Sequence, residues 1–243
     1  DLDRDAQKKN AAGFEISDED LLVYGSGGYR FLENRQATAP EKRQLVEREN
    51  PLTLDPDQAI VQPLPSDIDH DGDLDLVIAS STGMSLWINQ EKWTFTERTA
   101  TSLMEGNETV QPVSLAAVDW DRNVLVDILV GYEKGPLARL ENIRHGRVRW
   151  QALDPKLGPA DGVNQLLPCE MDGKGSWDLL TAHDKGISLT LTATRPGESV
   201  WATKTLEISN VATRGVRRWD PDNNGISDIL AWGNEGVQIY LGK

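Results

Sequence analysis

The sequence predicts an all-β fold, a β-propeller of four-stranded blades, with five repeat units visible in its 243 residues. Two regularities support this prediction. An aspartate followed by an apolar triplet recurs at steps of 55, 52, 51 and 50 residues, and a glycine stands eight residues after each of these aspartates. The aspartates are Asp20, Asp75, Asp127, Asp178 and Asp228, and the glycines are Gly28, Gly83, Gly135, Gly186 and Gly236. Tandem units of roughly 40 to 50 residues without helical periodicity are typical of a β-propeller.

Each unit is expected to hold four strands in a fixed order. The apolar triplet after the aspartate forms one strand, because it is short and rich in β-branched residues. The glycine then supplies the positive φ of a turn into a second apolar strand. Another strand precedes each complete aspartate loop, for example at 113–118 and 163–167. In three units a segment with a tryptophan supplies the remaining strand, at 93–95, 148–150 and 200–201.

The repeat places the units at approximately 1–55, 56–110, 111–160, 161–208 and 209–243, within a single propeller domain. Asp1 falls at the first position of an aspartate loop, so the first unit lacks its first strand. Lys243 follows a third strand, so the last unit lacks its fourth. Because the missing strands belong to different blades, we expect a fragment of a larger propeller of about seven blades. A closed ring of five blades is the alternative.

The loop 67–75 has the spacing of a calcium site. Calcium takes about six to eight oxygen ligands, which a loop can supply from alternate positions around one centre. Gly72 allows the sharp backbone reversal that this wrapping requires. An EF-hand is excluded, because Ile78 stands where its bidentate glutamate belongs and a strand follows the loop. The predicted ligands are Asp67, Asp69, Asp71, Asp73 through its backbone carbonyl, and Asp75.

Two further loops retain this pattern. Loop 220–228 keeps Gly225 at the bend, whereas loop 119–127 has Val124 there, and a β-branched residue resists a positive φ. The predicted ligands of loop 220–228 are Asp220, Asp222, Asn224, Ile226 through its carbonyl, and Asp228. The predicted ligands of loop 119–127 are Asp119, Asp121, Asn123 and Asp127.

The other two copies depart from the pattern. In loop 170–178, Lys174 brings an ammonium to position 5, so that a salt bridge from Lys174 to Asp172 or Asp178 is expected to hold the loop without metal. The first copy begins with three ligand-type residues in 1–5, but an insertion at 6–17 separates them from Asp20. In the complete loops calcium is expected to play a structural role, because it shields the repulsion between neighbouring carboxylates.

These repeats resemble the FG-GAP and VCBS repeats, which are propeller blades related to those of the integrin α-subunit head. The resemblance extends over essentially the whole chain, and its specific part is the run D-x-D-x-D-G-x-x-D-[LI]-[LVI] between the first and second strand of a blade. It implies an extracytoplasmic, calcium-binding propeller for recognition or adhesion, placed outside the cell, in the periplasm or at the cell surface. The family is functionally broad, so the fold transfers better than the function.

The net charge and the distribution of apolar residues limit the classes of partner that we expect. The net charge of −14 argues against nucleic acid and against an anionic membrane surface as partners, and no apolar run is long enough for a membrane span.

Cys169 is the only cysteine and is interpreted as a small buried hydrophobe. The histidines His70, His145 and His183 form no paired metal motif, and His70 is expected to face solvent. The sequence contains no G-x-S-x-G elbow or phosphate-binding loop, which favours a non-catalytic protein.

Three functions are compatible with these features. The first is a calcium-stabilised module that recognises a protein or glycan, or docks other domains of its own chain. The second is the propeller of a secreted carbohydrate-active enzyme, a lyase or hydrolase, and the third is an assembly subunit. Specific contacts are expected in the segments that break the repeat, 6–17 and 35–65, and a helical turn is considered for the charged stretch 41–49. Trp87, Trp93, Trp150 and Trp201 are expected on strands, packed between blades.

Overall fold

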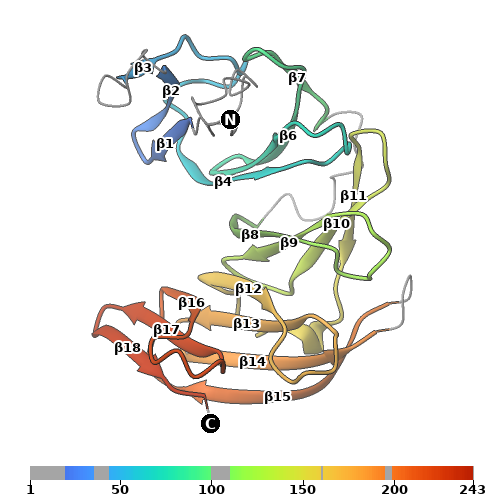
Figure 1. Ribbon diagram of the computed structural model, residues 1–243, viewed down its shortest axis with the longest axis vertical. Coiled ribbons are helices and arrows are strands. Elements are labelled where there is room, and N and C mark those ends of the chain that lie inside the picture. The colour runs from blue at the N-terminus through green and yellow to red at the C-terminus, as the bar shows by residue number, and fades with distance from the viewer. Residues whose placement is uncertain (1–19, 36–43, 100–109, 160, 195–198, 243) are drawn as a thin grey trace, which may run out of the picture. The chain divides into compact units, whose positions relative to one another are not determined.

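The computed structural model describes residues 20–35, 44–99, 110–159, 161–194 and 199–242. In these ranges the chain forms strands and the short 3₁₀ helix η3 (Pro155–Leu157), which confirms the predicted all-β fold. The strands form five antiparallel sheets that follow one another along the chain as the blades of a β-propeller, and Figure 1 shows them in colour order.

The three middle sheets have four strands each, in the predicted order. In every one, the acidic loop lies between the first and second strand, and the glycine turn lies between the second and third. They are β4 (Ile60–Ser66), β5 (Asp75–Ser80), β6 (Gly83–Asn89) and β7 (Phe95–Glu97); β8 (Pro112–Val118), β9 (Asp127–Tyr132), β10 (Ala138–Asn142) and β11 (Val148–Ala152); and β12 (Gln165–Cys169), β13 (Asp178–His183), β14 (Gly186–Ala193) and β15 (Trp201–Ser209).

The first and last sheets have three strands each among the described residues. They are β1 (Leu21–Gly25), β2 (Gly28–Arg35) and β3 (Gln44–Glu47), and β16 (Gly215–Trp219), β17 (Asp228–Gly233) and β18 (Gly236–Tyr240). Strand pairing aligns all five sheets on the same aspartate. The residue two positions after it pairs with the strand that follows the glycine turn in each sheet, as Leu22 pairs with Phe31 and Val77 with Leu86.

The recurring glycine is required by the hairpin turn. Gly186 has a φ of 140°, and a Cβ at this position would lie only 1.8 Å from the carbonyl oxygen of Ser209. Gly28 has a φ of 100°, and its Cβ would lie 2.0 Å from the carbonyl oxygen of Pro56. At these two positions a side chain is excluded both by the backbone angle and by the neighbouring chain, whereas at Gly83, Gly135 and Gly236 the positive φ alone favours glycine.

The second strands form the centre of each blade. All six residues of β5, of β9 and of β13 are buried, because each of these strands is paired on both edges and covered on both faces. This explains why the segments after the aspartates are continuously apolar and do not alternate with polar residues. Cys169, on β12, is buried as predicted, and burial raises the pKa of its thiol to about 12.

The described chain divides into two compact units, residues 1–103 with 144–147, and residues 104–143 with 148–243. In the second unit the first strands of successive sheets lie side by side, β8 next to β12 and β12 next to β16. Ser114 Oγ accepts a hydrogen bond from the Leu166 amide at 3.1 Å, and Gln165 Oε1 accepts one from the Val216 amide at 2.9 Å. Side chains of one blade thus bind the backbone of the next.

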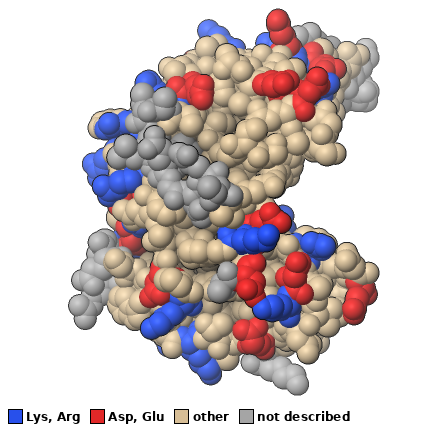
Figure 2. Space-filling model, turned by 180° about the vertical axis from the view of Figure 1, so that it is seen from behind, with Lys and Arg blue, Asp and Glu red and all other residues tan. Residues whose placement is uncertain are grey.

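Charged groups are distributed over the surface in small clusters. Figure 2 shows acidic and basic side chains next to one another on the face that it draws. Among the described residues, acidic side chains converge in loops 67–75, 170–178 and 220–228.

The tryptophans depart in part from the prediction. Trp87 is buried on β6, but Trp93 lies in a turn with a φ of 62°, and strand β7 begins only at Phe95. The turn is stabilised because the Trp93 ring packs edge-on against Phe31 and under the Arg48 guanidinium. Trp201 begins β15 and is exposed, so its predicted packing between blades was wrong.

The connection 35–65 is not simply a loop. Its described part contains β3 and most of β4, and residues 44–47 pair with β2 as an edge strand, so they do not form the helical turn considered for 41–49. Pairing with β2 satisfies backbone groups that an isolated helical turn would leave to solvent. The insertion 6–17 lies outside the described residues.

Candidate metal loops and a polar pocket

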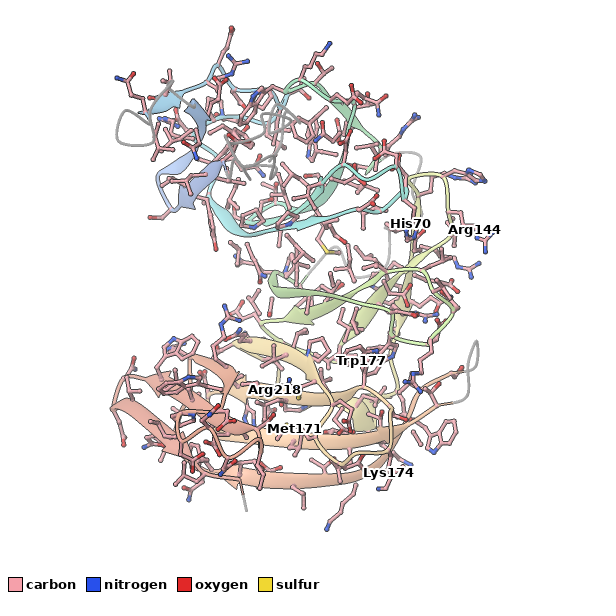
Figure 3. The ribbon with its side chains drawn as sticks, viewed as in Figure 1. His70, Arg144, Met171, Lys174, Trp177 and Arg218 are labelled. Atoms are coloured by element: carbon pink, nitrogen blue, oxygen red, sulfur yellow. The ribbon has the colours of Figure 1, made fainter. Side chains whose placement is uncertain are left out.

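Loop 67–75 folds around its first aspartate. The two carboxylate oxygens of Asp67 accept hydrogen bonds from the amides of Asp71 and Gly72, each at 3.1 Å, and Gly72 has a φ of 91°. This turn brings the carboxylates of Asp67, Asp69 and Asp71 together, with one oxygen from each within 4.8 Å of the others. His70 is exposed at the tip of the loop, as predicted, and Figure 3 labels it.

The donor set of this loop fits a calcium ion. Oδ1 of Asp69 is buried and has no hydrogen-bond partner in the described part of the chain. Burial raises the pKa of Asp69, and the charge of Asp71 raises it further. A bound cation would offset both effects, because it would supply the missing partner and neutralise the repulsion. Hard carboxylate oxygens are also the ligand type that calcium prefers.

Loop 220–228 repeats this geometry. Asp220 accepts the amides of Asn224 at 3.1 Å and Gly225 at 2.9 Å, and Gly225 has a φ of 82°. Asp220, Asp222 and Asp228 each place one oxygen within 4.8 Å of the others. Oδ2 of Asp228 is buried and accepts no hydrogen bond from any described residue. The donor set of this loop therefore fits a cation as well.

Loop 119–127 has the same backbone fold. Asp119 accepts the amides of Asn123 at 2.9 Å and Val124 at 3.0 Å. Val124 adopts a φ of 78°, so the loop closes around a valine in the left-handed region. Among the described residues, its acidic side chains do not form a three-membered cluster of the kind found in the two loops above.

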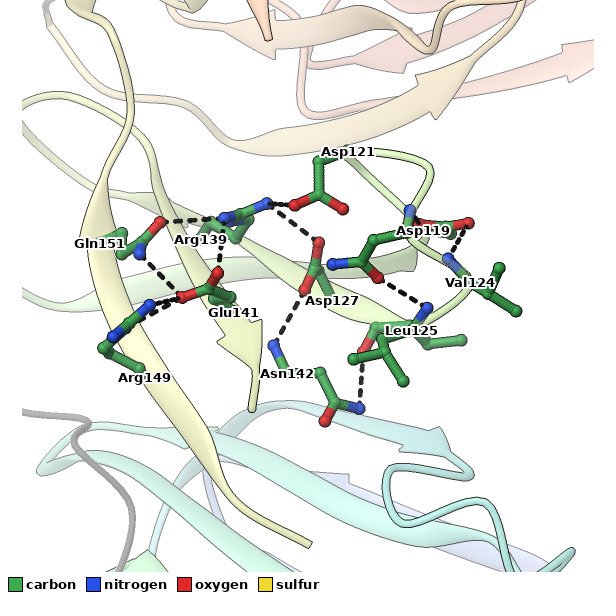
Figure 4. Close-up of polar contacts among 12 residues, drawn as sticks. Asp119, Asp121, Val124, Leu125, Asp127, Arg139, Glu141, Asn142, Arg149 and Gln151 are labelled. Carbon is green, nitrogen blue, oxygen red and sulfur yellow. Dashed lines mark hydrogen bonds and ion pairs between the residues drawn. The ribbon is translucent and has the colours of Figure 1, made fainter. Parts of the chain in front are cut away.

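An arginine enters loop 119–127 from strand β10. Arg139 Nη1 lies 2.8 Å from Asp121 Oδ2 and 3.3 Å from Asp127 Oδ2, and only 10% of the Arg139 side chain is exposed. Figure 4 shows the guanidinium between the loop and the pair Glu141 and Gln151 on the other side. Burial raises the pKa of Asp127 to about 6, although Arg139 acts in the opposite direction.

Loop 170–178 contains the predicted salt bridge. Lys174 Nζ lies 2.6 Å from Asp172 Oδ2, and 69% of the Lys174 side chain is exposed (Figure 3). Glu170, Asp172 and Asp178 still form an acidic cluster within 4.8 Å. In this loop an ammonium already contacts the carboxylate at position 3. The corresponding first loop, within 1–18, lies outside the described residues.

The final aspartate of each loop has a role that the sequence analysis missed. One oxygen of Asp75 accepts the Asn89 amide at 2.8 Å, and the other accepts the Ile68 amide at 2.8 Å. The carboxylate thus ties the start of the second strand to the end of the third. The signal in the sequence that could have revealed this role is the spacing, because the residue that donates its amide stands 14 or 15 positions after each aspartate. The same bond joins Asp20 to Asn34, Asp127 to Asn142, Asp178 to Thr192 and Asp228 to Gly242.

The predicted ligand sets can now be compared with these positions. The side chains of Asp67, Asp69 and Asp71 converge, as do those of Asp220, Asp222 and Asp228, whereas Asp75 is used mainly by backbone amides. Burial raises the pKa of Asp75 to about 7. Metal coordination by the side chain of Asn224 and by the carbonyls of Asp73 and Ile226 stays a prediction.

The second unit also contains a polar pocket of about 670 Å³. It lies beside strands β14 and β15 and the segment after η3. Most of the residues that line it carry hydroxyl, carboxylate, amide or ammonium groups, and Pro159 and Val163 add apolar surface. Among these residues are Asp161, Asn164, His183, Lys185, Thr190 and Glu207. Sequence reasoning did not find this pocket, because its residues come from separate strands.

A hydrogen-bonded chain crosses one wall of the pocket. Ser188 Oγ donates to Glu207 Oε2 at 2.8 Å and lies 2.8 Å from His183 Nε2. Because the single hydroxyl hydrogen points to the carboxylate, His183 Nε2 must be the donor to Ser188 Oγ. This polarity is the reverse of that in a serine nucleophile, where histidine accepts the hydroxyl proton. Burial lowers the pKa of His183, which favours its neutral form.

Comparison with known proteins supports the fold. Residues 67–130 match the family model described as FG-GAP-like repeat. No match was found among curated proteins. Among solved structures, an Agrocybe aegerita lectin that recognises non-reducing terminal N-acetylglucosamine has a TM-score of 0.60 and 14% sequence identity. The match covers 97% of this chain and 65% of the lectin.

Two further structures are chains from B. thetaiotaomicron. One is described as the extracellular domain of a one component system, with a TM-score of 0.52 and 14% identity over 92% of this chain. The other is described as the extracellular domain of a hybrid two component system, with a TM-score of 0.53 and 13% identity over 97% of this chain. The chain spans only 26% and 28% of these two proteins. In the described residues, no helix has the length and apolar character needed to cross a lipid bilayer.

Proposed function

We propose that this chain, a β-propeller with FG-GAP-like repeat sequence at 67–130, is a non-catalytic recognition module that works outside the cytoplasm and is stabilised by calcium. The polar pocket of the second unit carries the recognition part of this proposal. The converging carboxylates of loops 67–75 and 220–228 support the calcium part. The extracellular and lectin structures of the same fold support the location and the kind of ligand.

Calcium would be held in loop 67–75 by Asp67, Asp69 and Asp71, and in loop 220–228 by Asp220, Asp222 and Asp228. When bound, it supplies a fixed positive charge and no reactive group. The chain's own residues then maintain the loop, since Asp67 and Asp220 orient the backbone amides that form its bend. Because each loop connects the first and second strands of a blade, its order is transmitted to the sheet.

The ligand that we favour for the pocket is a glycan. Sugar hydroxyls both donate and accept hydrogen bonds, and the lining offers both functions through Thr190, Asn164 and Glu207. A cationic or strongly anionic ligand is a poorer match, because carboxylates and ammonium groups both line the pocket. A protein ligand, or another domain of the same chain, would instead be expected at the exposed loops.

The contacts within the pocket favour binding over catalysis. The His183–Ser188–Glu207 chain has the wrong polarity for an activated serine, and its members already satisfy one another. The alternative, the propeller of a secreted lyase or hydrolase, would require turnover of a polysaccharide by the protein.

A glycan array tests this proposal directly. We expect the protein to retain one class of glycan, and Glu207→Gln to weaken that binding at least about tenfold, because a charged hydrogen-bond acceptor in the pocket is lost. Glu97→Gln, an exposed change on β7, is the matched control and should leave binding unaltered. If Glu207→Gln binds as well as the wild type, the pocket is not the glycan-binding site. Release of shorter saccharides by the wild-type protein would favour the alternative function, a secreted lyase or hydrolase.

We also propose that the five sheets form one domain and are part of a larger propeller of about seven blades. The match to the lectin supports this proposal, because it covers 97% of this chain and only 65% of the lectin. The mass of the native protein distinguishes this arrangement from a five-bladed ring.

A further inference from the structure

Position 3 of the acidic loop has a different environment in loops 67–75 and 119–127. In loop 67–75, Asp69 lies close to the other carboxylates, and its Oδ1 is buried without a partner among the residues that the structure describes. In loop 119–127, Oδ2 of the corresponding Asp121 is bound by the Arg139 guanidinium at 2.8 Å, although Oδ1 of Asp121 is also buried without a partner among the described residues. The same type of loop therefore contains a carboxylate cluster in one blade and a buried ion pair in another.

Strand register shows that Arg139 is the exception among five equivalent residues. Arg139 pairs with Leu129, the residue two positions after the final aspartate of its loop. The residues at this register position in the other four sheets are all apolar. They are Phe31 opposite Leu22, Leu86 opposite Val77, Leu189 opposite Leu180 and Ile239 opposite Leu230.

The guanidinium is held in place from both sides. Nη1 contacts Asp121 and Asp127, while Nη2 donates to Gln151 Oε1 at 3.0 Å and lies 3.3 Å from Glu141 Oε1. Gln151 in turn donates to Glu141 Oε2 at 2.8 Å, which orients the pair (Figure 4). A planar guanidinium with donors in a fixed fork suits this arrangement better than a flexible ammonium.

We propose that Arg139 is a built-in cation that takes the place of calcium in loop 119–127. Its guanidinium forms ion pairs with the carboxylates of Asp121 and Asp127, which a calcium ion would need as ligands. The cost of burying those carboxylates is offset by a charge from the protein itself, so the blade needs no ion to close its loop. This inference rests on the proposed role of calcium.

If this proposal is right, replacing Arg139 with an apolar residue should allow loop 119–127 to bind a metal ion in place of the guanidinium. Arg139→Leu restores the residue type of the other blades and frees Asp121 and Asp127. We expect the variant to bind one calcium ion more than the wild-type protein in isothermal titration calorimetry. In chelator its melting temperature should fall below that of the wild type, and calcium should restore it. Arg139→Lys, which keeps the charge, is the control and should gain no calcium.

A second pair of variants keeps the test decisive if Arg139→Leu does not fold. Asp121→Asn should leave the calcium stoichiometry unaltered, because Asp121 binds Arg139 and no metal. Asp69→Asn, at the equivalent position of loop 67–75, should lose one calcium ion. Loss of a calcium ion in Asp121→Asn, or a folded Arg139→Leu without an additional ion, would overturn the inference.

Failure of the inference and failure of the proposed function give different results. If the wild-type protein binds calcium and Asp121→Asn loses an ion, the calcium role stands and Arg139 does not replace the metal. If the wild-type protein binds no calcium but Arg139→Leu gains one, the calcium role fails and the inference about Arg139 stands. If neither the wild-type protein nor Arg139→Leu binds calcium, the proposed role of calcium and the inference about Arg139 are both wrong.

Discussion

Single residues decide how each acidic loop is stabilised. Val124 occupies a position where loops 67–75 and 220–228 have glycine, and it adopts a φ of 78° with 81% of its surface exposed. The sequence analysis expected valine to resist this angle. The loop forms nevertheless, because Asp119 binds the amides of Asn123 and Val124 and fixes the bend. The strain is carried by a side chain that contributes little to packing.

Val124→Gly should therefore stabilise the protein. A left-handed backbone costs an L-residue about 1–2 kcal/mol, which the glycine variant would regain. Glycine is also more flexible in the unfolded chain, and this reduces the gain by about 0.5–1 kcal/mol. We expect a net increase of up to about 1.5 kcal/mol in the free energy of unfolding, measured in urea. The reverse exchange, Gly72→Val at the same position of loop 67–75, should destabilise. A less stable Val124→Gly protein would show that the valine contributes packing that outweighs its strain.

At the scale of elements, the final aspartate of each loop joins two strands. Asp178 accepts the Thr192 amide with one oxygen and the Met171 amide with the other, each at 2.9 Å. The carboxylate is therefore part of the blade's hydrogen-bond network whether or not a metal is present. This explains why the aspartate is found even in loop 170–178, where Lys174 contacts the acidic group at position 3.

Asp178→Ala separates the backbone role from a metal role. Two amides would lose their acceptor, and the buried Thr192 amide alone should cost about 1–3 kcal/mol, with a smaller cost from the partly buried Met171 amide. Urea unfolding should give the same loss in calcium and in chelator. Asp172→Asn, in the same loop, removes only an exposed ion pair and should cost less than about 1 kcal/mol. A loss for Asp178→Ala that appears only in calcium would instead identify Asp178 as a metal ligand.

At the scale of the whole molecule, each of the two compact units contains at least one described loop whose converging carboxylates fit calcium. Loop 67–75 belongs to the first unit and loop 220–228 to the second. In the second unit, the contacts of Ser114 and Gln165 with the next sheet couple neighbouring blades. Order in one loop is therefore expected to stabilise more than its own hairpin, as in other repeat proteins.

Calcium should raise the melting temperature and chelation should lower it. A ligand that binds only the folded state adds about 2.7 kcal/mol per site when its free concentration is 100 times its dissociation constant. The double variant Asp69→Asn and Asp222→Asn is the matched control, and its melting temperature should be indifferent to calcium. A wild-type melt that responds to neither calcium nor chelator would contradict the structural role of the ion.

Much of the architecture was predictable because it depends on short-range patterns. The period of the aspartates, the glycine turns and the strand order of the middle blades follow from residues within one hairpin, and the structure confirms them. Convergence of Asp67, Asp69 and Asp71 also follows from spacing alone, since alternate residues around a glycine bend face one centre. The Lys174 salt bridge was predictable for the same reason.

Other features depend on residues that only the tertiary structure brings together. Arg139 reaches loop 119–127 from another strand, and the pocket combines β14, β15 and the segment after η3. Strand pairing determines which of many distant side chains meets a given carboxylate, and one polar residue at an apolar register position is enough to change the cation of a loop. The sequence by itself therefore determined that the blades and their acidic loops exist, because both depend on local spacing. The tertiary structure decided which of these loops already contain a protein cation, because the charge of Arg139 comes from outside its loop.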